Sequence, residues 1–252
     1  MGSDRKGPAS PESPTGPDDG PDGKRIERFF GYRVGVTAGP TRAWIDPVRY
    51  IANASTGSLG SLIADRFAGA GAEVDYIAGP GACKPENRLV TIHEVETPAD
   101  VMKRLETLAQ SVSRAPFGLW VHAMAVLDFV PPLTNPKKIN SEKECLTLHL
   151  VPTPKILRRF KFFFPNSLLV GFKLETTKDP EKLRCAARIQ AAEAGCDLVV
   201  ANAPPFQDPE NHRAYFWDSR RAVWSGPFLG KPAIAETLFE WAGKALVSNA
   251  LP

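Results

Sequence analysis

Short apolar runs alternate with amphipathic segments along most of this chain, and that alternation limits the fold more than any other feature. Strands are predicted at Val34–Ala38, Glu73–Ala78, Leu89–Ile92, Phe117–Val126, Leu168–Lys173 and Asp197–Ala201. Helices are predicted at Ser58–Gly69, Pro98–Ser113, Pro180–Ala194 and Lys231–Leu246, where apolar residues recur at helical spacing. This order predicts an α/β fold: a doubly wound, mostly parallel, Rossmann-like sheet that binds ligands beyond the C-terminal ends of its strands.

The two ends of the chain differ from this pattern. Near the C-terminus, Ala214–Trp217 and Ala222–Trp224 flank a polar turn, which predicts a small antiparallel hairpin extending the sheet. Residues 1–25 are mostly Pro, Gly, Ser and Asp and cannot bury enough apolar surface to offset their ordering entropy. We therefore predict a disordered tail over residues 1–25 and one α/β domain over residues 30–250.

A proline-rich segment also interrupts the alternation in the middle of the chain. Residues 128–141 hold three prolines and a lysine pair that includes Lys138, which indicates a loop after the central strand. A strand is predicted next at Leu146–Val151. Pro152–Leu157 then opens a helix, with proline in the first turn where its missing N–H does no harm.

Composition excludes several classes of protein. Lys and Arg number 31 against 28 Asp and Glu, with no basic block, so non-specific nucleic-acid binding is not indicated. Four cysteines stand far apart without CxxC spacing, which disfavours a zinc site and a disulfide framework, and no metal site is predicted. No apolar run approaches the roughly 18 residues that cross a bilayer, and the N-terminus lacks a signal-peptide core. We expect a cytoplasmic protein without nucleic-acid or membrane partners.

The stretch from Val34 to Gly60 carries the clearest chemistry. A β-branched strand is followed by a loop of about twenty residues, which is long for such a connection and indicates function. The loop ends at a helix start containing Gly57 and Gly60, where backbone N–H groups and the helix dipole favour an anion. Arg49 and Asn53 add polar groups that a simple connector does not need. We interpret this stretch as the active-site loop.

Taken singly, these residues also have ordinary structural explanations. Asn53 is typical of a turn, Asp128 of a cap, and Lys138 of an exposed surface lysine. His122, inside an apolar strand, is better explained as a core histidine than as a catalyst. The glycine order differs from G-x-G-x-x-G, and the acidic residue of the second strand, Asp75, lies within it rather than at its end, which disfavours dinucleotide binding.

The motifs are more specific together than apart. The segments GPTRAWIDPVRYIANASTGSLG, HAMAVLDFVPP, KKINS, VPTPKIL, VGFKLET and DLVVAN occur in this order. As a set they resemble phosphopantothenate–cysteine ligase (phosphopantothenoylcysteine synthetase) of coenzyme A biosynthesis, in its stand-alone form, from about residue 33 to residue 246. The resemblance implies an amide-forming, nucleotide-dependent ligase that joins 4′-phosphopantothenate to L-cysteine through an acyl-nucleotide intermediate.

The resemblance also implies roles for individual residues. Asn53 and Arg49 match the family's substrate-binding and catalytic asparagine and arginine. Ala125 matches a small residue lining the substrate site, and Lys138 matches a lysine that supports the transition state. The implied nucleotide-binding residues are Ser55, Thr56, Gly57, Gly60, Asp128, Lys138, Pro154, Lys155, Phe172 and Lys173.

Some features depart from the family pattern. Two helix lysines that bind the triphosphate in the bacterial fused enzymes are replaced here by Gln190 and Ala194, and Asn140 and Ser141 stand where further lysines occur. Either CTP or ATP is therefore compatible with the resemblance. Mg²⁺ is expected with the nucleotide, no flavin is implied, and a homodimer is expected. The alternatives are a nucleotide-binding Rossmann-like oxidoreductase and a non-catalytic relative of the synthetase.

Overall fold

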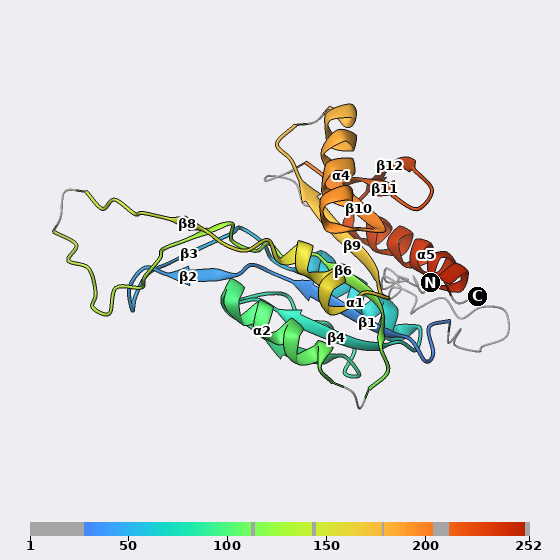
Figure 1. Ribbon diagram of the computed structural model, residues 1–252, viewed down its shortest axis with the longest axis horizontal. Helices are drawn as coiled ribbons and strands as arrows, with labels where there is room; N and C mark the ends of the chain where they lie inside the picture. Colours follow the sequence, from blue (N-terminus) through green and yellow to red (C-terminus); the bar gives the residue numbers. More distant parts are fainter. Residues whose placement is uncertain (1–27, 112–113, 143–144, 178, 204–211, 250–252) are drawn as a thin grey trace, which may run out of the picture.

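The computed structural model describes residues 28–111, 114–142, 145–177, 179–203 and 212–249, so the predicted tail at residues 1–25 lies outside the described part. Its main feature is an eight-stranded sheet in the order β12-β11-β10-β9-β6-β1-β4-β5 (Figure 1). The strands are β1 (Arg33–Ala38), β4 (Glu73–Ala78), β5 (Thr91–Glu94), β6 (Phe117–His122), β9 (Leu168–Leu174), β10 (Leu198–Asn202), β11 (Arg213–Asp218) and β12 (Val223–Leu229).

The strand directions define where the chain reverses its winding. β5, β4, β1, β6, β9 and β10 are parallel, whereas β11 and β12 form an antiparallel hairpin at one edge. From the central β1 the chain proceeds to β4 and β5 on one side, and then returns to β6, β9 and β10 on the other. The crevice beyond the C-terminal ends of β1 and β6 is thus the topological switch point, where open α/β sheets bind ligands. The predicted fold class is confirmed.

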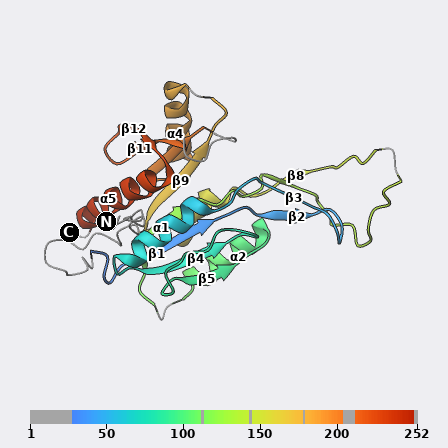
Figure 2. The same cartoon turned by 180° about the vertical axis from the view of Figure 1, so that it is seen from behind.

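Helices cover both faces of this sheet, as Figures 1 and 2 show. One face carries α1 (Ser58–Gly69) and α5 (Lys231–Asn249), whose apolar residues join one core cluster. The other face carries α2 (Pro98–Ala109), the 3₁₀ turn η1 (Ile156–Arg159), the short α3 (Phe160–Phe163) and α4 (Pro180–Ala194), which share a second cluster.

Local sequence explains where the helices begin and end. α2 begins with a capping box, in which the Thr97 hydroxyl accepts the Asp100 N–H and the Asp100 carboxylate accepts the Thr97 N–H. Asp179 caps α4 in a similar way by accepting the Glu181 N–H. α4 stops at Gly195, whose φ of 68° is the left-handed conformation that glycine adopts without strain.

A long arm extends from the sheet. It consists of the hairpin β2 (Arg42–Trp44) and β3 (Tyr50–Ala52) together with the segment from β7 (Phe129–Val130) to β8 (Val151–Pro152), excluding residues 143–144. Both views show these strands lying together and projecting away from the helices (Figures 1 and 2). The sequence did not predict the β2–β3 hairpin, and the strand predicted at Leu146–Val151 is wrong except for its last residue.

Other boundaries also shift. The strand predicted to reach Val126 ends at His122, because the chain leaves the sheet there to make an isolated bridge between Pro40 and Ala125. The strand predicted at Leu89–Ile92 begins two residues later, at Thr91. The helix predicted from Pro152 begins at Ile156 as a 3₁₀ turn. The hairpin and the remaining helices are confirmed, although α2 ends at Ala109.

Within the described ranges, no helix combines the length and the apolar character needed to cross a membrane. The same ranges hold no group of three or more His, Cys, Asp or Glu side chains that could bind a metal ion.

Candidate active site

The switch-point crevice is closed at its base by backbone hydrogen bonds between two loops. The Ala125 N–H donates to the Gly39 carbonyl at 2.8 Å, and the Thr41 N–H donates to the Ala125 carbonyl at 3.1 Å. The Thr41 hydroxyl, which is buried, accepts the Leu127 N–H at 2.9 Å. These bonds fix Ala125 at the C-terminal ends of β1 and β6.

Asn53 lies directly over this junction. Its side-chain amide donates to the carbonyls of Ala125 and Val126 at 3.1 and 3.0 Å, while the side chain stays exposed. Asn53 follows β3, so the base of the arm positions it. The structure therefore brings Asn53 and Ala125 together. Both residues were predicted to line the substrate site.

The turn from Ser55 to Gly60 follows at once and begins α1. Gly57 occupies the N-cap with φ 71°, and a Cβ there would lie 2.9 Å from the Gly39 backbone nitrogen. At Gly60 a Cβ would lie 2.5 Å from the Ala38 Cβ, so only glycine allows this approach of α1 to β1. The first turn of α1 holds no acidic residue and no side-chain cap. Such a terminus favours an anion.

Arg49 lies elsewhere, at the tip of the β2–β3 hairpin. Its Nη1 donates to the Asp46 carboxylate at 2.7 Å and to the Ile139 carbonyl at 3.2 Å. Extended chain rises about 3.3 Å per residue, so the four residues to Asn53 place the Arg49 backbone roughly 13 Å away. Within one chain, Arg49 and Asn53 are not brought together.

Asp46 organises this tip. Its buried carboxylate accepts the N–H groups of Val48, Arg49 and Ile139 as well as the Arg49 guanidinium. Burial alone would raise the pKa of Asp46, but these donors outweigh it and lower the pKa to about 2. The bond to Ile139 holds the neighbouring Lys138, which is exposed, beside Arg49 on the arm.

Asp128, Pro154 and Lys155 form a second group at the other side of the crevice. Thr153 fixes it by donating its N–H to the Asp128 carbonyl at 2.9 Å and its hydroxyl to the Leu127 carbonyl at 2.6 Å. The Lys155 ammonium then reaches the Asp128 carboxylate at 2.7 Å, with both side chains more than half exposed. Two of the predicted nucleotide residues are thus paired with each other.

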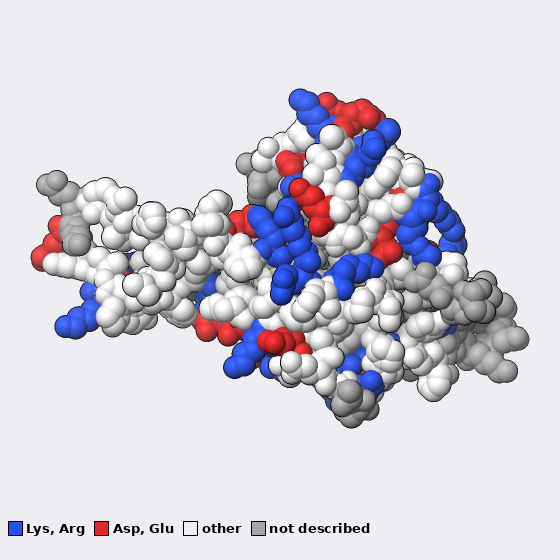
Figure 3. Space-filling view, in the orientation of Figure 1, with Lys and Arg blue, Asp and Glu red and all other residues white. Residues whose placement is uncertain are grey.

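A hollow of about 270 Å³ opens next to Lys155. Arg158, Lys173 and, from α4, Gln190 also line it. Lys173 pairs with Glu175 at 3.0 Å, and the Gln190 amide donates to the Phe172 carbonyl at 3.2 Å. Figure 3 shows Lys and Arg gathered here, where the arm meets the body below α4. Glu175 and Glu193 line the hollow too, and Arg158 pairs with Glu193 at 2.6 Å, so each of its three cations already has a carboxylate partner.

Phe172 points the opposite way from Lys173, since adjacent strand residues face opposite sides of a sheet. Its half-buried ring packs against the α1–α5 core, which also contacts Leu59. The predicted nucleotide residues consequently divide between two faces of β9: Phe172 lies with the Ser55–Gly60 turn, and Lys173 lies with Lys155.

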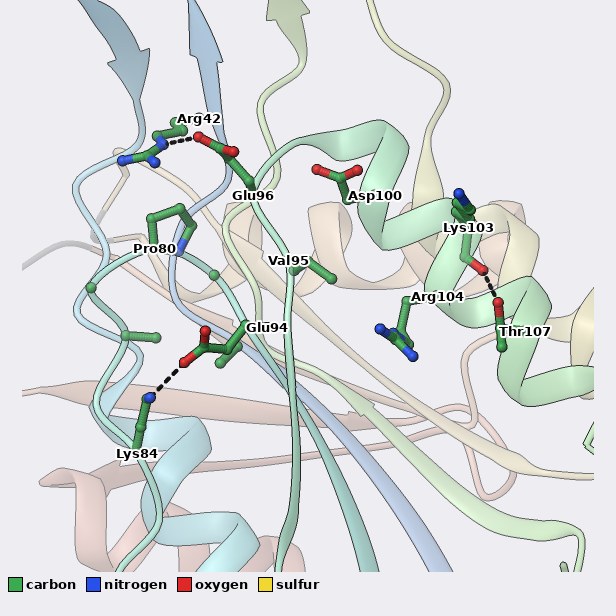
Figure 4. Close-up of a pocket in the computed structure, with 14 residues that line it drawn as sticks. Arg42, Pro80, Lys84, Glu94, Val95, Glu96, Asp100, Lys103, Arg104 and Thr107 are labelled. Carbon is green, nitrogen blue, oxygen red and sulfur yellow. Dashed lines mark hydrogen bonds and ion pairs between the residues drawn. The ribbon is translucent and has the colours of Figure 1, made fainter.

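A larger hollow lies farther along the sheet edge, between β4, β5 and α2 (Figure 4). It has a volume of about 670 Å³, and none of the predicted site residues lines it. Much of its charge is neutralised internally, because Lys84 pairs with Glu94 and Arg42 pairs with Glu96, both at 2.6 Å. Arg42 alone connects this hollow to the arm.

His122 is a core residue, as interpreted from the sequence. Its ring lies 2.7 Å from the Thr37 hydroxyl and packs on Phe160 at 5.0 Å between ring centroids. Burial lowers the pKa of His122 to about 4, so the ring is neutral near neutral pH. A neutral buried ring stiffens the floor of the crevice but carries no charge into it.

Sequence reasoning missed Lys231 altogether. This lysine begins α5, yet its ammonium lies 2.5 Å from the Ser58 hydroxyl, at the first residue of α1 and 173 residues earlier in the chain. A lysine after a glycine at a helix start gives no signal of such a contact, which only the packing of α5 beside α1 creates.

The fold and the crevice define a class: doubly wound α/β proteins with a glycine-containing helix N-terminus at the switch point. Within that class, residues 29–245 match the family described as DNA/pantothenate metabolism flavoprotein C-terminal domain. The chain belongs to this family. It is 40% identical over 219 residues to the coenzyme A biosynthesis bifunctional protein CoaBC of Thermococcus kodakarensis, a match covering 86% of this chain and 52% of the relative.

Solved structures agree with the assignment. A DNA/pantothenate metabolism flavoprotein from Streptococcus pneumoniae superposes with a TM-score of 0.74 at 30% identity, covering 85% of this chain and 100% of that one. The C-terminal domain of a coenzyme A biosynthesis bifunctional protein CoaBC has a TM-score of 0.72 at 26% identity, covering 88% and 99%. The chain spans about half the length of the curated relative above.

Proposed function

We propose that this chain is a phosphopantothenate–cysteine ligase. The observation that carries the proposal is the position of Asn53, whose amide sits on the Ala125 and Val126 carbonyls next to the Ser55–Gly60 turn. An oriented amide thus borders an anion-favouring turn at the switch point of the sheet. Activation of a carboxylate by a nucleoside triphosphate needs such a juxtaposition.

The reaction has two steps. A carboxylate oxygen of 4′-phosphopantothenate attacks the α-phosphorus of the nucleotide, and pyrophosphate leaves. The amine of L-cysteine then attacks the acyl carbon, loses a proton and expels the nucleoside monophosphate, which leaves the amide. Both steps depend on alignment and on neutralisation of phosphate charge more than on acid–base groups.

The predicted residues at the crevice receive roles in this scheme. The Asn53 amide exchanges one of its two carbonyl contacts for the pantothenate carboxylate beside Ala125. The Ser55–Gly60 turn binds phosphate oxygens through the N–H groups that the start of α1 leaves without a helical partner. Asp128 contacts the ribose or base edge, with Lys155 and Pro154 beside it. Phe172 packs against the nucleobase, and Lys173 adds positive charge on the far side of β9. These roles remain proposals drawn from geometry and family resemblance.

The co-substrate is CTP or ATP, and Mg²⁺ accompanies its phosphates rather than binding in a protein cage. Asp128 offers an exposed carboxylate beside Lys155 in the proposed nucleotide site. Flavin has no part in the proposed reaction. A cytoplasmic location stays a prediction from the sequence.

We also propose a homodimer formed through the arm. The arm exposes Val48, Tyr50, Phe129, Leu133, Leu146, Leu148 and Leu150, a concentration of apolar side chains that favours a protein interface. Pairing of two arms would carry Arg49 and Lys138 of one copy toward the crevice of the other. The dimer therefore accounts for the separation of Arg49 from Asn53 within one chain.

The oxidoreductase alternative finds less support. A dinucleotide fold needs an acidic side chain at the end of the second strand to bind ribose. Asp75 of β4 is fully buried instead and bonded to Arg33 and His93.

A coupled assay tests the ligase. Purified protein is incubated with 4′-phosphopantothenate, L-cysteine, Mg²⁺ and either CTP or ATP, and pyrophosphate and amide product are both quantified. We expect equimolar pyrophosphate and amide with at least one nucleotide. No turnover with either nucleotide would contradict the proposal.

A further inference from the structure

The N-terminus of α5 brings an unpaired cation to the N-terminus of α1. Lys231 is half-buried, and its ammonium lies 2.5 Å from the Ser58 hydroxyl. No carboxylate within the described ranges forms an ion pair with it. The first turns of both helices lack acidic residues, and Glu236, one turn farther along α5, pairs with Arg66.

Among the described residues, the polar neighbours of Lys231, Ser58 and His212, carry no negative charge. The Asn202 amide at the end of β10 lies 3.2 Å from His212 Nε2. Burial, and then the charge of Lys231, lower the pKa of His212. A half-buried ammonium beside two helix N-termini, whose dipoles also present positive charge, is unfavourable unless an anion joins it.

Packing of α5 on α1 does not need this lysine. The two helices meet through apolar side chains, among them Phe67 and Phe239, whose ring centroids lie 5.3 Å apart. Arg66 of α1 also pairs with Glu236 of α5 at 2.7 Å. The Lys231–Ser58 contact is therefore an addition to an interface that is already complete.

We propose that Lys231 binds the phosphates of the nucleotide at the Ser55–Gly60 turn, so that α5 supplies a cation to the triphosphate site. The assignment rests on the proposed function. The ammonium exchanges its contact with the Ser58 hydroxyl for a phosphate oxygen and neutralises charge there, whereas Gln190 and Ala194 on α4 carry no charge. The Lys231 ammonium contacts the two phosphates that leave as pyrophosphate.

The test is Lys231→Met, which removes the charge and keeps the apolar stem, against Lys244→Met as the matched control. Lys244 is an exposed lysine of the same helix. Binding of a non-hydrolysable nucleoside triphosphate and of the corresponding monophosphate is measured by titration calorimetry with Mg²⁺. We expect Lys231→Met to weaken triphosphate binding about 10- to 100-fold, as for loss of a charge-assisted contact, and monophosphate binding less than about twofold.

Thermal unfolding separates this role from a structural one. Without nucleotide, the Lys231→Met variant should melt at or above the wild-type temperature, because the substitution removes an unpaired charge. With triphosphate, the variant should not show the rise in melting temperature that the wild type shows. A lower melting temperature without ligand, or triphosphate binding equal to wild type, would overturn the assignment. Wild type that binds triphosphate but forms no amide would contradict only the ligase, whereas wild type that binds no nucleotide would overturn both.

Discussion

The side-chain amide of Asn53 lies 3.1 Å from the carbonyl oxygen of Ala125, a residue 72 positions later in the chain. This contact joins the base of the arm to the loop after β6, and it does so at the switch point of the sheet. Asn53 is thereby held in one orientation while its side chain stays exposed to a ligand. Preorganisation of this kind is what a positioning-dominated reaction requires.

Asn53→Asp should separate activation from ligation. The introduced carboxylate cannot donate to the two carbonyls and repels them, so the acyl-nucleotide still forms but reacts poorly with L-cysteine. We expect amide formation to slow about 10²-fold, as for loss of an oriented donor, with the fold intact. Pyrophosphate and amide are quantified separately, with Asn166→Asp on an exposed turn as control. Wild-type kinetics in Asn53→Asp would remove this residue from the site.

Lys138→Gln should slow the first step more than it weakens binding. The lysine stabilises charge that develops on the phosphates, so its loss lowers kcat by about 10² with a smaller change in KM. Lys137→Gln is the matched control, since Lys137 is the adjacent exposed lysine of the same loop. If both variants lose equal activity, the effect belongs to the general charge of the arm.

Asp46→Asn should loosen the tip of the arm. Hydrogen exchange of the Val48, Arg49 and Ile139 amides should accelerate, because a neutral amide oxygen accepts these bonds more weakly than a carboxylate. In the native protein the pKa of Asp46 is lowered from 3.8 to about 2. Its stabilisation is therefore present above pH 3.8 and is lost as pH falls toward 2. Unchanged exchange in Asp46→Asn would show that the carboxylate does not hold the tip.

His122 should make the fold sensitive to mild acid. Its pKa falls from 6.5 to about 4 on folding, so the unfolded chain binds more protons between these values and stability rises with pH across that window. The stabilisation is fully present above pH 6.5, and about 3 kcal/mol is lost on going down to pH 4. Denaturant unfolding of His122→Gln should show a shallower pH dependence there, and an equally steep one would contradict the assignment.

Leu148→Glu should weaken the homodimer, because it places a charge on the apolar surface of the arm. Light scattering coupled to size-exclusion chromatography would show a shift to monomer at low protein concentration. Leu229→Glu, on the edge strand β12, is the control and should stay dimeric. Monomeric wild type would contradict the dimer proposal.

Much of the fold was predictable because each core strand carries its own apolar signal. Helix ends were predictable from the sequence where caps occur, as at Thr97 and Gly195. The arm was not predictable. Leu146, Leu148 and Leu150 alternate as in a strand, but the described part of the chain offers that segment no strand partner before Val151. Alternation predicts which side chains share a face and cannot show whether a neighbouring strand exists.

The site was predictable only in part. Asn53, Ala125 and the Ser55–Gly60 turn come together because the segments that follow the adjacent strands β1 and β6 meet at the same edge of the sheet. Arg49 was expected beside Asn53, but the intervening hairpin carries it away. The approach of Lys231 to Ser58 depends on packing between the first and last helices. Local sequence patterns do not predict such packing.

The central claim is that the chain activates a carboxylate as an acyl-nucleotide. Its most direct test uses 4′-phosphopantothenate labelled with ¹⁸O in the carboxylate, incubated with L-cysteine, Mg²⁺ and the nucleotide that supports turnover, followed by mass spectrometry of the products. The account predicts one ¹⁸O atom in the nucleoside monophosphate and none in pyrophosphate. Label in inorganic phosphate together with a nucleoside diphosphate, or no label transfer during amide formation, would contradict it.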